Sequence, residues 1–323
     1  MAENYFFDLI KDDFGRISIP KACHFSLGTS PYYAHQNALA IDIYYNLSLN
    51  ESEVLSPVEG KVIESRIMSA PKAKFDGGID REYLTIIESP ENSNIVFKIL
   101  HVKSNLKKGD YIEIGDFLGT TIRNGYFAYW SSPHLHLEIR NRHDAVRARG
   151  GKEFSINFGN FDSLNPNNSQ NKEKEIIRGI VKESHPEFIL AHLADDLYYR
   201  IGEILGVCCN LHNKARNTNL DCIVDGGIPI YKNGLILSHK KINCKDTCLV
   251  NFASCEIGTI SGARNHFGFL KFNNVKFYVN DIEVRGISFF LAFFYPLIKI
   301  IPFEKDSLKF DSGSILKIKA AVN

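Results

Sequence analysis

The sequence predicts a mainly β protein built from two domains, and three observations lead to this expectation. The chain has 323 residues, which at roughly 100 to 200 residues per domain suits two domains better than one. Short runs of β-branched and aromatic residues recur between turn signals. A run of turn formers, Asn165 to Asn171, interrupts them near the middle. We therefore expect one domain over residues 1–160, a linker over 161–175 and a second β-rich domain over 176–323.

The first half of the chain is expected to be all β. The predicted strands lie at residues 38–45, 54–65, 83–88, 95–101, 111–122 and 134–140. Glycines mark tight corners in two similar stretches, Ser56 to Val62 and Lys108 to Gly119. This placement of glycines at the corners is typical of a small β-sandwich with sharp turns.

The second half is expected to combine at least one helix with β-hairpins. Within Pro186 to Leu205, apolar side chains recur at steps of three and four residues, which predicts a helix. They are Leu190, Leu193, Leu197 and Ile201. Further along, Lys232 to Gly234 separates two apolar runs and predicts a hairpin turn.

Composition argues against a disordered, membrane-embedded or nucleic-acid-binding protein. Hydrophobic residues make up 44% and charged residues 23%, which is typical of a folded globular protein. Lys and Arg number 38 against 37 Asp and Glu, so the formal net charge is +1. Because no overall field attracts polyanions, we expect no nucleic-acid partner.

Location and redox state follow from weaker signals. Met1 to Asp8 lacks the basic start and apolar run of a secretory signal, which predicts a cytoplasmic protein. The seven cysteines lack the spacing of a disulfide scaffold, so we expect reduced thiols. The most apolar segment, Ser288 to Phe303, is shorter than a bilayer span and predicts a buried strand or a partner surface. Membrane contact and oligomeric state stay open.

The strongest chemical signal lies on one predicted strand. Within Pro133 to Ile139, His134, His136 and Glu138 alternate with apolar residues, so a strand turns them to one face. Neighbours at i and i+2 lie about 6 to 7 Å apart, close enough for both imidazoles to act around one metal ion. The alternative is a half-buried strand whose wet face carries histidines.

Asp42, His35 and His101 are further candidates. Asp42 lies in the otherwise apolar run Ala38 to Tyr45, where it needs a metal or a cation as partner, or an opening to a solvent-filled cleft. His35 can share a ligand with Asp42 only if the chain bends near Asn37. His101 ends an apolar strand, where a histidine is either a base or a structural residue bonded to backbone.

These residues resemble the lysostaphin-type zinc metallopeptidases, a family of glycyl-glycine endopeptidases that mostly cut peptide cross-links of bacterial cell walls. The resemblance covers roughly Ser26 to Arg140 and implies a duplicated-hybrid-motif β-sandwich for the first domain. It rests on blocks in the family's order: His35 with Ala40 to Ile43, Ser56 to Val62, His101 followed by Lys108 to Asp110 and Gly115 to Gly119, and Ser131 to Glu138.

The resemblance also implies a set of metal ligands. Asp42 and His136 correspond to zinc ligands of the family. The family most often has its first zinc histidine four residues before the aspartate, where this chain has Ala38. His35 is therefore the candidate for the third ligand of Zn²⁺.

His101 and His134 would then stand beside a zinc-activated water as catalytic acid and base. The implied function is a zinc-dependent metalloendopeptidase that hydrolyses a peptide or peptidoglycan-like substrate. The family resemblance also makes an extracellular or cell-surface location the alternative to the cytoplasm.

Two other functions compete with this interpretation. One is a catalytically inactive lysostaphin-like binding or regulatory protein, which Ala38 favours and the retention of the other site residues disfavours. The other is a biotin or lipoyl carrier domain, which needs a modifiable lysine at an exposed hairpin tip. No such tip lies between the two glycine-marked stretches.

Overall fold

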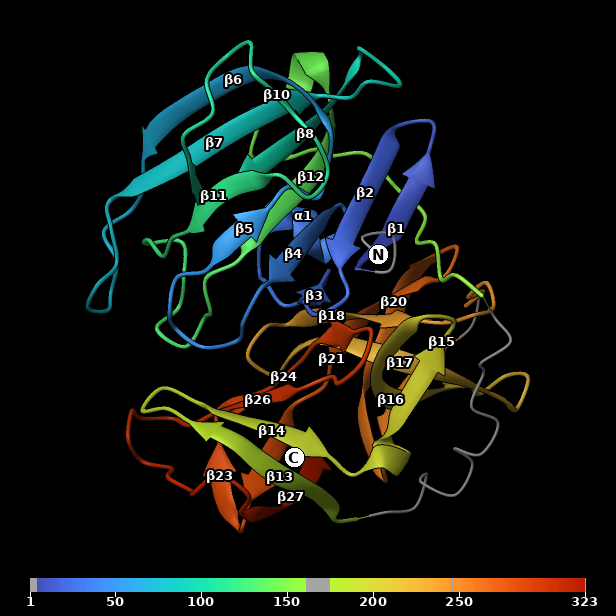
Figure 1. Cartoon of the computed structure of the whole chain (residues 1–323). Helices are drawn as coiled ribbons and strands as arrows, with labels where there is room; N and C mark the ends of the chain where they lie inside the picture. Colours follow the sequence, from blue (N-terminus) through green and yellow to red (C-terminus); the bar gives the residue numbers. More distant parts are fainter. Residues whose placement is uncertain (1–4, 161–174, 245–246, 323) are drawn as a thin grey trace. The chain divides into compact units, whose positions relative to one another are not determined.

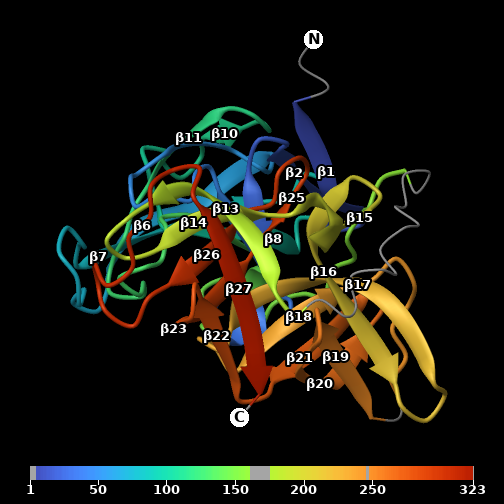
Figure 2. The same cartoon turned by 90° about the horizontal axis from the view of Figure 1, so that it is seen from below.

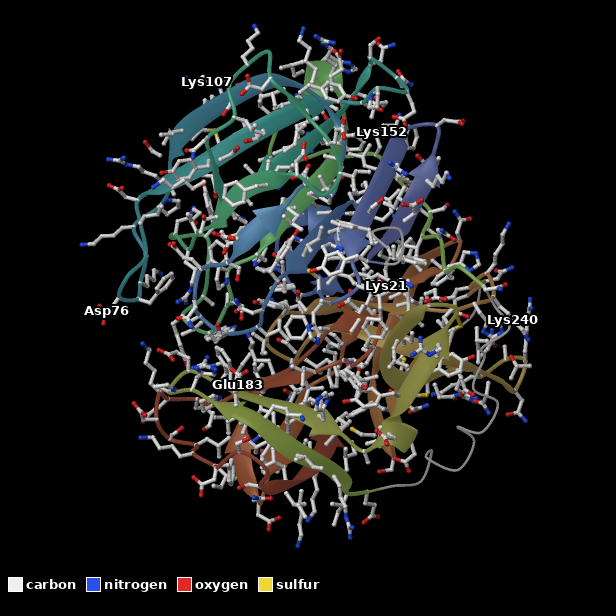
Figure 3. The ribbon with its side chains drawn as sticks, viewed as in Figure 1. Lys21, Asp76, Lys107, Lys152, Glu183 and Lys240 are labelled. Atoms are coloured by element: carbon white, nitrogen blue, oxygen red, sulfur yellow. A yellow bond between two sulfur atoms is a disulfide. The ribbon has the colours of Figure 1, made fainter. Side chains whose placement is uncertain are left out.

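The computed structural model of the chain describes residues 5–160, 175–244 and 247–322 and is mainly β (Figure 1). Two compact units divide the chain. One comprises residues 1–25 and 33–157, and the other comprises residues 26–32 and 158–323. The predicted linker over 161–175 lies, except for Glu175, outside the described residues. Charged side chains such as Asp76, Lys107 and Glu183 are exposed on these units (Figure 3).

The N-terminal unit is built on one antiparallel sheet in the order β10-β6-β7-β8-β12-β4. A hairpin, β1 with β2, and a small sheet, β5-β11-β9, complete it. The strands are β1 (Phe6–Asp12), β2 (Gly15–Pro20), β4 (Ala40–Tyr44), β5 (Glu53–Leu55), β6 (Gly60–Ser69), β7 (Arg81–Glu88), β8 (Ile95–Leu100), β9 (Val102–Ser104), β10 (Tyr111–Ile112), β11 (Phe117–Thr121) and β12 (Leu135–Asn141), with β3 (His24–Ser26) at the boundary of the units.

Strand β12 lies between β8 and β4 in this sheet and is buried on both faces. Leu135, Leu137 and Ile139 point to one face as the sequence alternation predicts. His136 and Glu138 occupy the other face, and both are buried too. The alternative of a half-buried strand with a wet histidine face is therefore wrong, because this face is buried.

The C-terminal unit combines a barrel with a second antiparallel sheet. Strands β16, β17, β18, β21, β20 and β19 pair in this order, and β19 returns to β16. Strands β23, β22, β27, β13, β14, β26 and β24 form the sheet. Figure 2 labels the first six of them. One apolar core that includes Phe252, Phe277 and Phe289 lies within this unit.

The strand bounds of this unit are as follows. They are β13 (Ile177–Ser184), β14 (Ile189–Leu193), β15 (Tyr198–Ile201), β16 (Ile204–Asn213), β17 (Thr218–Ile228), β18 (Asn233–Leu237), β19 (Cys248–Phe252), β20 (Cys255–Arg264), β21 (Phe267–Phe272), β22 (Val275–Val279), β23 (Ile282–Val284), β24 (Gly286–Phe289), β25 (Leu291–Ala292), β26 (Ile298–Ile301) and β27 (Ile315–Val322). Strands β17 and β18 form a hairpin, but its turn lies before Asn233, because Asn233 and Gly234, which were predicted as turn residues, belong to β18.

The helix predicted within Pro186 to Leu205 is absent, because this segment folds as strands. It contains β14, the 3-10 turn η4 (Asp195–Leu197), β15 and the start of β16. Strand β14 pairs with both β13 and β26. Short strands inside a core carry continuous apolar runs, and such runs have the same spacing as the buried face of a helix.

The expectation of reduced thiols is wrong for one pair, because Cys244 and Cys248 are joined by a disulfide, with their Cα atoms 6.0 Å apart. Cys23, Cys209, Cys222 and Cys255 are not disulfide-bonded. Within the described residues the α-helical structure is confined to α1 (Tyr33–Gln36). No helix in this part of the chain has the length and apolarity needed to cross a bilayer.

Candidate metal centre

Four neighbouring strands of the N-terminal sheet, β7, β8, β12 and β4, bring the site residues together. In the register of β12 with β4, His136 lies directly opposite Asp42. On the other side of β12, His136 lies opposite Leu100, the last residue of β8, so His101 follows at the same level. The sheet thus gathers residues separated by 94 positions along the chain.

His35 reaches the same place through a turn rather than a strand. Helix α1 ends at Gln36, and the side chain of Asn37 donates a hydrogen bond of 2.8 Å to the carbonyl of Tyr33. Ala38 then adopts a left-handed backbone with φ of 48°, and its N–H donates to the carbonyl of His35. This reversal is why a histidine seven residues before Asp42 can lie beside it.

Three ligand-type atoms converge on one point. His35 Nε2 lies 3.2 Å from Asp42 Oδ1 and 3.2 Å from His136 Nδ1, and His136 Nδ1 lies 2.9 Å from Asp42 Oδ1. Ligands bound at about 2.0 Å to a tetrahedral ion lie about 3.3 Å apart, so these distances match three corners of such a site. All three side chains are buried. The cluster could therefore hold a metal ion.

Charge supports this arrangement. Burial alone would raise the pKa of Asp42, but the charges of His134 and His35 and hydrogen bonds with His136 and His35 hold it well below its usual range. Burial likewise opposes the protonated form of His136, yet Asp42 and Glu138 raise its pKa to about 9. A metal ion must displace that proton from His136.

Glu138 contacts the side of the His136 ring away from Asp42, and two buried cations hold Glu138 in turn. His136 Nε2 lies 3.0 Å from Glu138 Oε1, and an N–H at this position leaves the Nδ1 lone pair for a metal ion. Lys98 Nζ donates to Glu138 Oε1 at 2.9 Å, and Arg140 Nη1 donates to Oε2 at 2.7 Å. Burial raises the pKa of Glu138, but His136 and Lys98 outweigh it and lower that pKa to about 2. Glu138 is thus an ionised anchor for His136.

His134 lies on the opposite side of Asp42. Its Nδ1 donates to the carbonyl of Ser132 at 2.9 Å, and its Nε2 lies 3.4 Å from Asp42 Oδ2. The rings of Tyr44 and Phe127 each lie 4.9 Å from the imidazole, between centroids. Burial lowers the pKa of His134 to about 4 although Asp42 opposes this shift. His134 is therefore a neutral imidazole at pH 7.

Glu82 on β7 fixes His101. Its Oε1 accepts the backbone N–H of His101 at 2.8 Å, and its Oε2 lies 2.6 Å from His101 Nδ1. Asn124 donates to the same Oε2 at 2.9 Å. With a proton on Nδ1, the His101 lone pair is on Nε2, and the ring lies 5.3 Å from His134 and 5.8 Å from His136 between centroids.

All five residues singled out from the sequence, His35, Asp42, His101, His134 and His136, thus meet in one region of the N-terminal unit. Sequence analysis placed Glu138 on the same strand face as His136 without giving it a role, and it missed Lys98 and Glu82. Lys98 in the apolar run of β8 was a visible signal, because a buried cation needs a partner. Glu82 had no local signal, since its partner lies 19 residues away.

Comparisons with known proteins are limited. Residues 16–156 match a family model described as "Domain of unknown function (DUF8155) N-terminal domain". The comparison with curated proteins found no match.

Several solved structures resemble the chain weakly. A chain of the SpoIIIAH and SpoIIQ complex is 17% identical, with a TM-score of 0.26, and the match covers 38% of this chain and 87% of that one. A solution structure of lysostaphin is 16% identical, with a TM-score of 0.25 and coverage of 62% and 93%. The antimicrobial peptidase lysostaphin from Staphylococcus simulans is 15% identical, with a TM-score of 0.24 and coverage of 62% and 92%.

Proposed function

We propose that the N-terminal unit is a zinc-dependent metalloendopeptidase. The observation that carries this proposal is the triangle of His35 Nε2, Asp42 Oδ1 and His136 Nδ1, with sides of 2.9 to 3.2 Å. Two imidazole nitrogens and one carboxylate oxygen are ligand types that Zn²⁺ accepts, and three protein ligands are typical of catalytic rather than structural zinc. When bound, zinc would polarise the scissile carbonyl and acidify a water molecule.

The remaining histidines supply the proton transfers. His101, held by Glu82 through Nδ1, offers Nε2 to take a proton from the attacking water. Cleavage of the peptide C–N bond requires a proton on the departing amine, and the protonated His101 delivers the proton that it took from the water. The aromatic rings of Tyr44 and Phe127 beside His134 limit access of bulk water.

The substrate class follows from the same chemistry. A neutral base, a Lewis acid and a proton donor to nitrogen together suit amide hydrolysis. We propose a peptide or peptidoglycan-like substrate.

The test combines metal content with cleavage. Purified protein should hold about one zinc per chain, and His35→Ala, Asp42→Ala and His136→Ala should each lose most of it. His143→Ala, an exposed histidine of the same unit, is the matched control and should keep it. The wild type and the control should cleave members of a peptide library that includes glycine-rich cross-link peptides, and the three ligand variants should not.

Two results would change the interpretation. Wild-type protein that takes up no zinc when it is supplied would contradict the metal centre. Protein that binds zinc at the three ligands but cleaves no peptide in the library would instead support a binding or regulatory role for the same site.

A further inference from the structure

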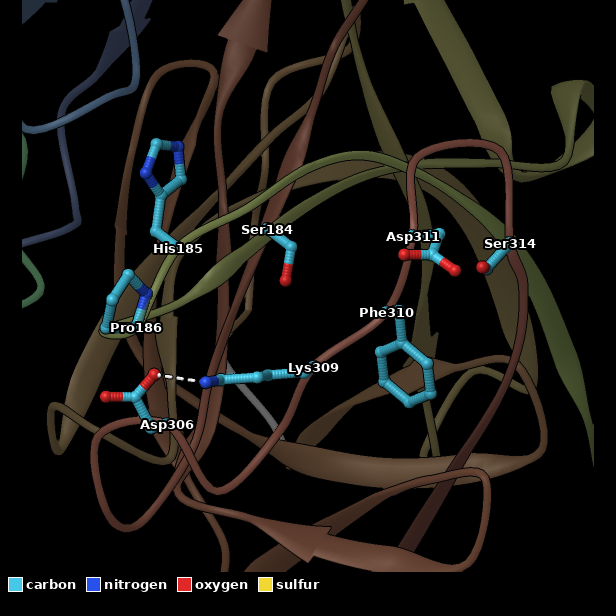
Figure 4. A pocket seen from close by; sticks show the side chains of 8 residues that line it. All are labelled: Ser184, His185, Pro186, Asp306, Lys309, Phe310, Asp311 and Ser314. Atoms are coloured by element: carbon cyan, nitrogen blue, oxygen red, sulfur yellow. Dashed lines mark ion pairs between the residues drawn. The ribbon is translucent and has the colours of Figure 1, made fainter.

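The C-terminal unit contains a pocket of about 540 Å³ between the β13–β14 turn and the β26–β27 loop (Figure 4). This volume is within the roughly 300 to 1,000 Å³ range of small-molecule sites. The lining residues are Ser184, His185, Pro186, Asp306, Lys309, Phe310, Asp311 and Ser314.

Backbone hydrogen bonds build the walls of this pocket. Asp306 N–H donates to the carbonyl of Pro186 at 2.8 Å, which ties the loop to the turn. Val181 and the loop exchange two further bonds, from Val181 N–H to Ser314 and from Gly313 N–H to Val181, at 3.0 and 2.8 Å. The pocket is therefore formed before any ligand arrives, which reduces the entropic cost of binding.

Phe310 forms an apolar surface between two polar ends. The ring is half-buried and packs against the core of the unit, so its position is set. Asp311 and Ser314 both line the pocket, and the Ser314 N–H donates to the carbonyl of Asp311 at 3.0 Å (Figure 4). Lys309 Nζ and Asp306 Oδ1 form an ion pair of 2.9 Å at the other end.

The polar groups near Asp311 are available to a ligand. Among the described residues, the side chains of Asp311, Ser184 and Ser314 make no hydrogen bond to another protein group. Two carboxylates against one lysine make the lining unfavourable for an anion. His185 does not make the lining more favourable for an anion, because its Nε2 lies 3.1 Å from the Glu183 carboxylate oxygen Oε2.

We propose that this pocket binds a neutral saccharide. A purely apolar ligand would desolvate Asp311, Ser184 and Ser314 without replacing their hydrogen bonds to water. A sugar ring presents a C–H face that packs on Phe310 and hydroxyl groups that donate to the Asp311 carboxylate and exchange hydrogen bonds with the serines. This site is independent of the proposed peptidase activity.

The test is titration of isotope-labelled full-length protein with glucose, galactose, mannose, N-acetylglucosamine and their disaccharides, followed by NMR. At least one sugar should shift the resonances of Ser184, Phe310 and Ser314 with a Kd in the millimolar range or tighter. Asp311→Asn should weaken binding by about tenfold or more, because a hydrogen bond to a charged group is lost. Asp281→Asn, an exposed carboxylate outside the pocket, is the matched control and should bind as the wild type does.

Phe310→Leu provides a second variant that keeps an apolar side chain in the core, and it should weaken sugar binding while the spectrum stays folded. Several outcomes would overturn the proposal. They are no shift with any sugar at about 50 mM, far above a millimolar Kd, equal binding by Asp311→Asn and wild type, or pocket shifts with inorganic phosphate or spermidine in place of sugars.

Discussion

Glu138 is the residue whose removal tests the metal centre most directly without touching a ligand. It accepts from His136 Nε2 and is itself held by Lys98 and Arg140. We expect Glu138→Gln to lower zinc affinity by about 10- to 100-fold, because such outer partners orient the ligand and raise its basicity. Competition with a chromophoric chelator measures this. Glu64→Gln, a partly exposed carboxylate on β6, is the control, and equal affinities of the two variants would contradict the role of Glu138.

Glu82 separates catalysis from metal binding. It contacts His101 but none of the three ligand-type residues. We expect Glu82→Gln to keep its zinc and lose about 100-fold or more in kcat, since His101 is no longer held in one tautomer. Steady-state kinetics together with zinc content measure the two effects. Loss of zinc in parallel with activity would show instead that Glu82 holds the whole site in shape.

Glu82 also makes stability depend on pH. Burial raises its pKa, but His101 and Asn124 outweigh this and lower the pKa from 4.5 to about 2. A carboxyl with a depressed pKa stabilises the fold above its unfolded pKa and loses this effect as the pH falls through its folded pKa. At pH 7 the free energy of unfolding of the wild type should therefore be larger than that of Glu82→Gln by about 3 kcal/mol. This difference should shrink between about pH 4.5 and pH 2.

Urea unfolding of both proteins at a series of pH values measures this difference. Asn124 offers a check, because Asn124→Ala removes one of the bonds that lower the Glu82 pKa. The stability that ionised Glu82 contributes should then be lost at a higher pH. A constant difference across the acid range would contradict the assignment.

At the scale of elements, one glycine determines whether β6 can pair with β7. Gly60 has φ of 144°, and a Cβ there would collide with the carbonyl of Glu88 on β7. We expect Gly60→Ala to destabilise the N-terminal unit by more than about 3 kcal/mol, since steric overlap adds to backbone strain. Gly77, with φ of 79° and no atom within 4 Å of a built Cβ, is the matched control.

Gly77→Ala should cost only about 1 to 2 kcal/mol, because strain acts there without overlap. Chemical unfolding monitored by a probe in the N-terminal unit compares the two variants. Equal losses would mean that the contact between β6 and β7 relaxes easily.

At the scale of the whole molecule, zinc should stabilise one unit selectively. The ligand-type residues His35, Asp42 and His136 all lie in the N-terminal unit. Ligand that binds only the folded state stabilises it by about 4 kcal/mol at 1,000 times its Kd. Hydrogen exchange should therefore slow in β4 and β12 on addition of zinc and stay unchanged in β16 and β17.

His35→Ala is the control for this experiment, and it should show no slowing anywhere. Slowing in the barrel strands of the wild type as well as in β4 and β12 would contradict a metal effect confined to the N-terminal unit. Slowing of β4 and β12 in His35→Ala would place the metal on other residues.

Local pattern by itself determined the mainly β character, most strands of the first half and the unusual residues within them. Alternation assigns His136 and Glu138 to the face opposite Leu135 and Leu137, because strand periodicity depends only on neighbouring residues. Asp42 stood out because a carboxylate in an apolar strand needs a partner.

Only the tertiary structure decided which partners these residues meet. The register that sets Asp42 opposite His136, the contact of Glu82 with His101 and the disulfide between Cys244 and Cys248 depend on how the chain folds back on itself. The segment predicted as a helix became β14 and β15 for the same reason, since pairing with β13, β26 and β16 outweighs local spacing. Sequence periodicity records which face a side chain takes, whereas register and pairing are set by contacts between distant residues.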